Sequence, residues 1–272
     1  MKRAYLLLFS VGMLVALHVQ VCQGAESLEL DGLIEPYMVV NVGSGVIGVL
    51  EVVTVDRGDF VKKNQVLANL QSGVEKAAME LARARAQMEA TVKSREANVD
   101  FCARKQARAQ ELYEKQVLPF SQMDEAETNR ALAELELQEA LENKRLAELE
   151  FRRAIEVLKR RAIRSPIDGV VVERFLSPGE YVENQPIVKL AQIHPLNVEV
   201  VVPVSLFGSI KKGMRATVRP EAPIGGEYVA QVKIVDRVVD AASGTFGVRL
   251  ELPNPGYRLP AGLKCVVRFP RR

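Results

Sequence analysis

Three glycines have the spacing of a nucleotide-binding loop: Gly43, Gly45 and Gly48 match the pattern G-x-G-x-x-G. Such a loop binds a pyrophosphate only when a helix begins at its glycines, because the N–H groups of that helix contact the phosphates. Here the following residues, 49–55, form a β-branched and apolar run typical of a strand. We therefore interpret the match as fortuitous and expect no nucleotide or other cofactor.

Imidazole and thiol groups are the other candidates for chemistry. His194 is the only histidine after residue 24, and the proline that follows it predicts a turn. One histidine cannot form a histidine metal cluster. Cys102 is expected far along a helix and Cys265 in a late strand, beyond the roughly 7 Å that a disulfide allows, so we predict two free thiols. The acidic residues lie mostly among Lys and Arg on helices, and the sequence indicates no catalytic or metal site and no enzyme.

The first 24 residues have the pattern of a secretory signal peptide. Lys2 and Arg3 precede an apolar run, and small residues follow near Gly24. The apolar run is shorter than the roughly 20 residues of a membrane-spanning helix. We therefore expect cleavage after Gly24, with a retained anchor or a lipid on Cys22 as alternatives. Removal of Lys2 and Arg3 lowers the formal net charge from +3 to +1, which gives no electrostatic reason to expect a nucleic acid partner.

The sequence repeats itself at an offset of 121 residues. Residues 48–61 read GVLEVVTVDRGDFV and residues 169–182 read GVVVERFLSPGEYV, so Gly48 aligns with Gly169 and Gly58 with Gly179 without a gap. Each copy has a β-branched run, a glycine turn and a second short apolar run. Because neither copy can bury a core alone, we expect the two to pack face to face as a flattened β-sandwich.

The residues between the two copies have a helical composition. Segments 73–117 and 122–163 contain no proline, and Gly73 is their only glycine. The patterns Ser72-x-x-Glu75 and Ser121-x-x-Asp124 predict the helix starts, and Pro119 predicts the turn between them. Two helices of equal length, each at least about 60 Å long, joined by a short turn must form an antiparallel hairpin.

Apolar residues at alternating three- and four-residue spacing predict which helix faces pack together. The track of the second helix, interrupted by Arg130 and Lys144, consists of Ala126, Ala133, Leu137, Ala140, Ala147, Phe151, Ala154 and Leu158. The weaker track of the first helix consists of Leu81, Met88, Val92, Val99, Cys102 and Ala109. A further stripe lies off these tracks, and we expect it to pack against another copy of the chain or, as the alternative, to face solvent. Its members are Leu132, Leu135, Leu146 and Leu149.

The C-terminal part is rich in strands. Segments 197–202, 214–219, 228–235, 246–252 and 264–269 are separated by Gly, Pro or Asn, and segments 228–235 and 246–252 alternate between apolar and polar residues. Five or six strands of this kind predict a small closed or nearly closed barrel, to which residues 28–40 could add a strand.

The sequence as a whole predicts an elongated α+β fold: a split β-sandwich with an inserted long antiparallel α-helical hairpin, followed by a small β-barrel. The expected segments are a signal peptide at 1–24, an N-terminal strand segment at 25–42, the first half of the sandwich at 43–72, the hairpin at 73–162, the second half at 163–194 and the barrel at 195–272.

This order of parts resembles the HlyD-type membrane fusion proteins, the periplasmic adaptor subunits of resistance-nodulation-division and related bacterial pumps. The resemblance covers the chain from about Tyr37 onward and is carried by residues 58–67 (GDFVKKNQVL), 164–170 (RSPIDGV), 195–200 (PLNVEV) and 259–262 (LPAG). It implies two lipoyl-like halves, a hairpin that reaches toward an outer-membrane channel, and a barrel near an inner-membrane transporter.

The resemblance also implies a contact site at the hairpin tip. The family pattern there is Arg-x3-Leu-x6-Ser, which Arg108 and Leu112 match, whereas Pro119 stands at the serine position. We expect contacts with the channel from Arg108, Leu112, Leu118 and Phe120, with ordinary turn packing as the alternative.

The function implied is that of an exported adaptor, a homo-oligomer that links transporter and channel for efflux or secretion. A biotin or lipoyl carrier is disfavoured because the hairpin occupies the place of the carrier's modified lysine. A periplasmic coiled-coil scaffold or chaperone without transport is the alternative, and co-purification with neither membrane partner would favour it.

Overall fold

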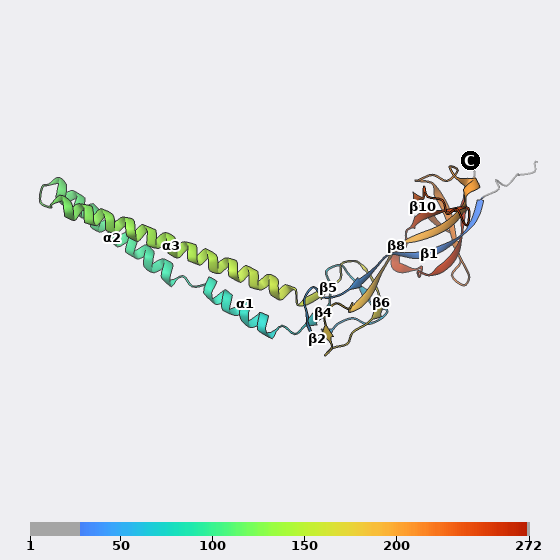
Figure 1. Cartoon of the computed structure of the whole chain (residues 1–272), viewed down its shortest axis with the longest axis horizontal. Helices are drawn as coiled ribbons and strands as arrows, with labels where there is room; N and C mark the ends of the chain where they lie inside the picture. Colours follow the sequence, from blue (N-terminus) through green and yellow to red (C-terminus); the bar gives the residue numbers. More distant parts are fainter. Residues whose placement is uncertain (1–27, 271–272) are drawn as a thin grey trace, which may run out of the picture. The chain divides into compact units, whose positions relative to one another are not determined.

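The computed structural model describes residues 28–270, so the predicted signal peptide lies outside the described residues. The chain forms two compact units. One contains Pro36–Pro195 with Pro255–Tyr257, and the other contains the residues up to Glu35, Leu196–Asn254 and those from Arg258 onward. The elements (Figure 1) are β1 (Leu28–Val42), β2 (Gly48–Val53), β3 (Phe60–Val61), β4 (Val66–Leu70), α1 (Gly73–Ala86), α2 (Ala90–Glu114), α3 (Phe120–Lys159), β5 (Ala162–Arg164), β6 (Gly169–Arg174), β7 (Tyr181–Val182), β8 (Val188–Pro203), η1 (Val204–Leu206), β9 (Arg215–Pro220), β10 (Tyr228–Val235), β11 (Thr245–Leu252), η2 (Pro255–Tyr257) and β12 (Leu263–Phe269).

The two copies of the repeat form the predicted β-sandwich. The bounds of β2 and β3, shifted by the repeat offset, coincide with those of β6 and β7. The pairing is reciprocal, because Gly48 faces Val182 between β2 and β7 while Gly169 faces Val61 between β3 and β6. Strands β5-β4-β2-β7 form one sheet, and β3, β6 and the first part of β8 pair in turn. Side chains from both copies share one buried core, which includes Leu50, Leu67, Leu70, Val171, Val182, Ile187 and Leu190.

The repeat also extends upstream of the residues that revealed it. The Ser44 hydroxyl donates to the carbonyl oxygen of Val46 at 2.5 Å, and the Ser165 hydroxyl donates to that of Ile167 at 2.6 Å. Both serines form the same local turn at equivalent positions of the two copies. The sequence carried this signal, because residues 42–48 and 163–169 share an aliphatic residue, the serine, a second aliphatic residue and the glycine in one spacing.

The predicted hairpin is confirmed, and α3 runs antiparallel to α1 and α2 (Figure 1). The track predicted for the second helix is correct: Ala126, Ala133 and Ala140 are buried and the other five members are partly buried. Its two polar interruptions reach across the hairpin. Arg130 Nη1 donates to Gln106 Oε1 at 2.9 Å, and Lys144 Nζ donates to Glu89 Oε1 at 3.4 Å.

The first arm differs from the prediction because it is two helices, separated at residues 87–89. Leu81 and Met88, which the predicted track included, are exposed, whereas Met79, Ala82 and Ala86 are the partly buried apolar residues of α1. The apolar positions of α1 and those of α2 do not fall on one face of a continuous helix. Both segments can pack on α3 only if the helix is interrupted and its phase reset.

The helix starts were only partly predicted. Ser72 precedes α1, but its side chain makes no capping hydrogen bond. The second start is wrong by two residues: α3 begins at Phe120, directly after the extended Pro119, so Ser121 lies inside the first turn. Proline has no N–H group, but this costs nothing at position 119, because the first N–H groups of a helix have no partner within the helix.

The second unit is the predicted barrel, closed by six strands in the order β1-β12-β9-β10-β11-β8, with β1 pairing again with β8. Inward side chains fill it, among them Val198, Val218, Val232, Leu250 and Val267. The turn predicted at His194 is wrong, because β8 continues through it. Ala191 pairs with β6 and Leu196 pairs with β11, so Pro195 lies where β8 exchanges one neighbouring strand for another.

Candidate partner-docking site

The tip of the hairpin is closed by backbone hydrogen bonds. Val117 N–H donates to the Leu112 carbonyl at 2.9 Å, and Gln116 N–H donates to the Tyr113 carbonyl at 2.8 Å. Gln116 has a left-handed backbone with φ of 57°. This is a Schellman motif, which satisfies the last carbonyl groups of α2. The side chains of the turn are therefore not needed to close it.

The structure brings together three of the four residues predicted for the tip. They line a hollow, here called the tip hollow, formed by Lys105, Arg108, Ala109, Leu112, Leu118, Gln122, Glu125 and Ala126. Phe120 lies outside it, at the first position of α3. Its ring meets that of Tyr113 edge-on, with the centroids 6.0 Å apart, so Phe120 extends the surface of the tip.

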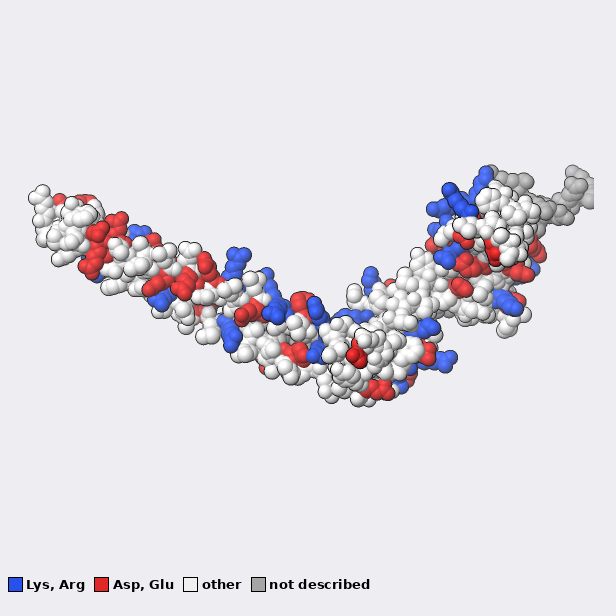
Figure 2. Space-filling view, viewed as in Figure 1, with Lys and Arg blue, Asp and Glu red and all other residues white. Residues whose placement is uncertain are grey.

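The prediction missed two exposed residues at the tip, Tyr113 and Val117. Val117 is 70% exposed, and Tyr113 is exposed beside the predicted residues Leu112 and Phe120. Figure 2 shows a mostly uncharged surface at this end of the hairpin. Val117 and Tyr113 lie outside the family pattern, but the sequence YEKQVLPF, apolar and aromatic around a proline turn, is a signal that could have found them.

The charges of the tip lie beside this apolar surface. Glu111 and Lys115 pair on the last turns of α2, four residues apart, while Lys105, Arg108 and Glu125 contribute to the tip hollow. Exposed apolar side chains surrounded by charged groups are typical of a surface that binds another protein. The tip has this combination of exposed apolar side chains and neighbouring charges.

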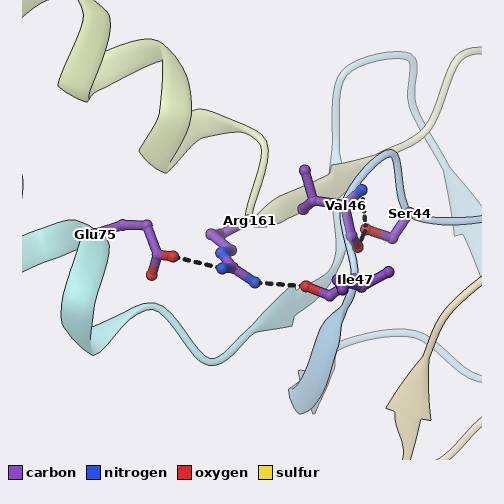
Figure 3. Close-up of polar contacts among 5 residues, drawn as sticks. All are labelled: Ser44, Val46, Ile47, Glu75 and Arg161. Atoms are coloured by element: carbon purple, nitrogen blue, oxygen red, sulfur yellow. Dashed lines mark hydrogen bonds and ion pairs between the residues drawn. The ribbon is translucent and has the colours of Figure 1, made fainter.

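At the opposite end of the hairpin, Arg161 connects the helices to the sandwich (Figure 3). Its Nη1 donates to the Ile47 carbonyl at 2.9 Å, and its Nη2 pairs with the carboxylate of Glu75 in the first turn of α1. The Glu75 and Arg161 side chains are only 15% and 23% exposed. The pKa of Glu75 is lowered by a hydrogen bond from its own backbone N–H and by Arg161. Sequence reasoning gave Glu75 only a capping role, because the partner lies far along the chain.

The groups first considered for chemistry are placed as follows. Gly43 and Gly45 lie in the connection to β2, and a strand rather than a helix begins at Gly48, as predicted. Cys102 and Cys265 are free thiols, also as predicted, and burial raises the pKa of Cys265 to about 11.

Within residues 28–270, no three His, Cys, Asp or Glu side chains gather as metal ligands would. No helix of that stretch has both the length and the apolar character needed to cross a bilayer.

The predicted stripe on α3 is solvent-exposed in the single chain. Leu132, Leu135, Leu146 and Leu149 are between 49% and 62% exposed. They lie away from the buried alanines of the same helix, so they do not contribute to the hairpin interface. The stripe is a second apolar surface of the hairpin.

A split sandwich with a helical hairpin inserted between its halves, followed by a six-stranded barrel, defines the membrane fusion proteins, the adaptor family of efflux pumps. The model of the CzcB-like, barrel-sandwich hybrid domain matches residues 38–192, more than half of the chain, and that of the CusB-like, beta-barrel domain matches residues 196–272. The chain therefore belongs to the membrane fusion proteins with a CzcB-like barrel-sandwich hybrid domain.

Solved structures share the fold. MacA from Actinobacillus actinomycetemcomitans is 23% identical with a TM-score of 0.73, over 89% of this chain and 78% of that one. The membrane fusion protein Spr0693 from Streptococcus pneumoniae R6 is 14% identical with a TM-score of 0.63, over 90% and 100%. At these identities the likeness shows the fold alone.

Two curated relatives are similar in sequence. A UPF0194 membrane protein in the asrC 5' region of Acidithiobacillus ferridurans is 29% identical over 118 residues, which are 39% of this chain and 35% of the relative. An uncharacterized protein of Haemophilus influenzae is 24% identical over 256 residues, 93% of this chain and 60% of the relative. The chain thus spans less than two thirds of either relative.

Proposed function

We propose that the protein is a periplasmic adaptor that links an inner-membrane transporter to an outer-membrane channel for efflux or secretion. The observation that carries this proposal is the tip of the hairpin, where the side chains of Leu112, Tyr113, Val117 and Phe120 are exposed around a turn that is closed by backbone hydrogen bonds. Exposed aromatic and aliphatic side chains that serve no purpose within the chain are suited to fill pockets of a partner.

The rest of the hairpin supports the same role. α3 has 40 residues, and at 1.5 Å per residue it holds the tip about 60 Å from its own other end. Arg161 and Glu75 tie the base of the hairpin to the sandwich. An adaptor of this kind works by length and docking, so it needs no catalytic group. The predicted signal peptide would export the chain to the periplasm.

A site-specific crosslinking experiment tests the docking claim. A photoreactive amino acid placed at Val117 in cell envelopes should capture an outer-membrane protein, which mass spectrometry then identifies. The matched control is Val74, which is also exposed but lies in the first turn of α1 at the base of the hairpin. It should not capture that protein.

The double variant Arg108→Ala/Phe120→Ala should abolish the Val117 crosslink and export, because it removes one positive charge that lines the tip hollow and the most exposed aromatic ring of the tip. Circular dichroism should show unchanged helix content, since both side chains are exposed. Undiminished crosslinking and export in this variant would rule out the tip as the docking site. Capture of no membrane protein from either position would favour a periplasmic scaffold.

We further propose that the stripe of Leu132, Leu135, Leu146 and Leu149 packs against a neighbouring copy of the chain. Leu135→Glu together with Leu149→Glu should shift the protein toward monomer in analytical ultracentrifugation without loss of helix. Leu141→Glu is the control for a single Leu135→Glu change. Leu141 is also an exposed leucine but, six residues later, lies on a different face of the helix. An unchanged mass in the double variant, or an equal shift in the control, would contradict the proposal.

A further inference from the structure

One end of the barrel collects two connections and both outer strands. The connection between β8 and β9, residues 204–214, meets that between β10 and β11, residues 236–244, where Val204 N–H donates to the Gly244 carbonyl at 2.9 Å. The start of β1 and the end of β12 lie at the same end, because Leu28 pairs with Phe269 and both line one hollow with residues of the connection between β8 and β9. These residues form what is here called the loop end of the barrel.

Large apolar side chains are exposed at the loop end. Val204 is 47% exposed, Phe207 54% and Val238 83%. Phe207 is held in position, since its ring contacts that of Phe246 edge-on with the centroids 5.3 Å apart. Beside it lies a hollow lined largely by apolar residues, among them Leu28, Leu206, Met214 and Phe269, with Lys211 and Lys212 in its wall. The loop end therefore offers apolar contact and positive charge at the same place.

The cations of the loop end differ from those of the barrel wall. On the wall, Arg219, Lys233, Arg249 and Arg268 each pair with a glutamate. In the part of the chain that the structure describes, the four cations at the loop end take part in no ion pair; they are Lys211, Lys212, Arg215 and Arg237.

Asp236 and Asp240, the acidic residues of the connections at the loop end, both lie between β10 and β11, and Glu29 at the start of β1 pairs with Arg268. Asp240 accepts a hydrogen bond from Ala242 N–H at 2.9 Å, so its carboxylate is engaged within the loop. The connection between β8 and β9 has no acidic residue. Figure 2 shows Lys and Arg gathered on one side of an uncharged patch at the top of the barrel, with acidic residues below the patch.

We propose that the loop end rests on an anionic phospholipid surface. Apolar side chains that project among basic residues enter the boundary between headgroups and acyl chains, while the cations bind the phosphates. A protein partner would be expected to bring acids that pair with specific cations in a fixed geometry. Lipid phosphates need only a local excess of unpaired positive charge, which is what the connection between β8 and β9 supplies.

The test uses the absence of tryptophan from the sequence. Phe207→Trp introduces a single reporter into the full chain. With vesicles of equal parts phosphatidylglycerol and phosphatidylcholine, its emission should shift to the blue and be quenched by brominated acyl chains. Val229→Trp, exposed on the barrel wall, should show neither change. Residues 1–27 are the same in every variant, so any vesicle binding through them is common to both reporters.

Charge removal completes the test. In the Phe207→Trp chain, Lys211→Gln together with Lys212→Gln should weaken binding to the anionic vesicles by about 30-fold, since each basic residue near such a surface contributes roughly a factor of five. The matched control is Arg258→Gln with Lys264→Gln, which removes two exposed cations from the opposite end of the barrel and should leave binding unchanged.

Emission that does not respond to anionic vesicles would overturn the proposal and leave a protein contact as the use of the loop end. An equal loss of binding in the control would also overturn it, since the attraction would then depend only on net charge. Neither result affects docking at the hairpin tip, which crosslinking at Val117 measures separately.

Discussion

The two copies of the sandwich share their turns but differ in what lies against their first glycine. Gly58 and Gly179 have φ of 94° and 93°, and no atom lies within 4 Å of a Cβ built on either. A Cβ on Gly169, by contrast, would collide with the Ala191 carbonyl, whose carbon atom would be 2.9 Å away. On Gly48 the one close approach would be to the end of the Arg161 side chain, at 2.7 Å, with Leu70 at the ordinary contact distance of 3.6 Å.

A one-residue difference in strand register explains the contrast. Leu50 of β2 pairs with Leu70, whereas the equivalent residue of β6, Val171, pairs with Leu190 and not with Ala191. The shift brings the Ala191 backbone next to Gly169. The repeated sequence thus sets the turns and the reciprocal pairing, while the path of the chain after each copy, into a helix or along β8, sets the local packing.

The largest expected effect is at Gly169. Gly169→Ala should destabilise β6 and β8 by about 3 kcal/mol, because a backbone carbonyl must move to make room. Gly48→Ala should cost only about 1 kcal/mol, the value of one hydrogen bond from Arg161 to the Ile47 carbonyl. Hydrogen exchange followed by mass spectrometry can measure both, since it reports the strands separately. Equal losses in the two variants would mean that the register difference has no energetic consequence.

Much of this architecture could be predicted from the sequence, because it depends on local or repeated patterns. The aligned glycines predicted the sandwich, Pro119 predicted the turn of the hairpin, and the alanine track predicted the face of α3 that packs. The docking role of the tip stays a prediction. Its predicted residues Arg108, Leu112 and Leu118 share one hollow, but contact with a partner depends on a surface that the chain does not contain.

The features that were missed depend on relations between distant residues. The interruption at residues 87–89 has no proline or glycine to mark it, and it arises because two apolar tracks must meet the same helix. Arg161 could not be paired with Glu75 from the sequence, because the pair requires the base of the hairpin to be folded. Pro195 led to the wrong prediction of a turn, because the change of neighbouring strand that occurs there leaves no signal in the local sequence.

The connection at the base of the hairpin, present in the first copy only, should have the next largest effect. Arg161→Ala removes the hydrogen bond to Ile47 and the ion pair with Glu75, and should increase local opening of residues 43–47 and of the first turn of α1 by about 2 kcal/mol. Arg161→Lys should restore only part of the lost local stability, because an ammonium group cannot reproduce the planar fork of donors. Hydrogen exchange of the same peptides measures local opening in both variants. If lysine restored the full stability, the contact would depend on charge alone and not on the geometry of the guanidinium group.

This connection should also depend on pH. The pKa of Glu75 is lowered in the folded protein, so the stability it contributes is fully present above its ordinary value of 4.5 and is lost as the pH falls through the lowered pKa. Glu75→Gln should flatten the pH dependence of local opening in that acidic range, after correction for intrinsic exchange rates. If the pH dependence of local opening were unchanged in this variant, it would arise from other carboxylates.

The smallest expected effect is at the turns, where the two copies are alike. Gly58→Ala and Gly179→Ala should each cost about 1 kcal/mol, because an L side chain disfavours this left-handed backbone and no neighbouring atom adds a collision. Equal losses of stability in the two variants are the informative result, and hydrogen exchange of the two sandwich sheets measures these losses. If the cost at Gly179 clearly exceeded that at Gly58, the asymmetry of the second copy would extend from its strand register into its turn. Equal costs, next to unequal costs at Gly48 and Gly169, would confine the difference between the copies to the strands that continue from them.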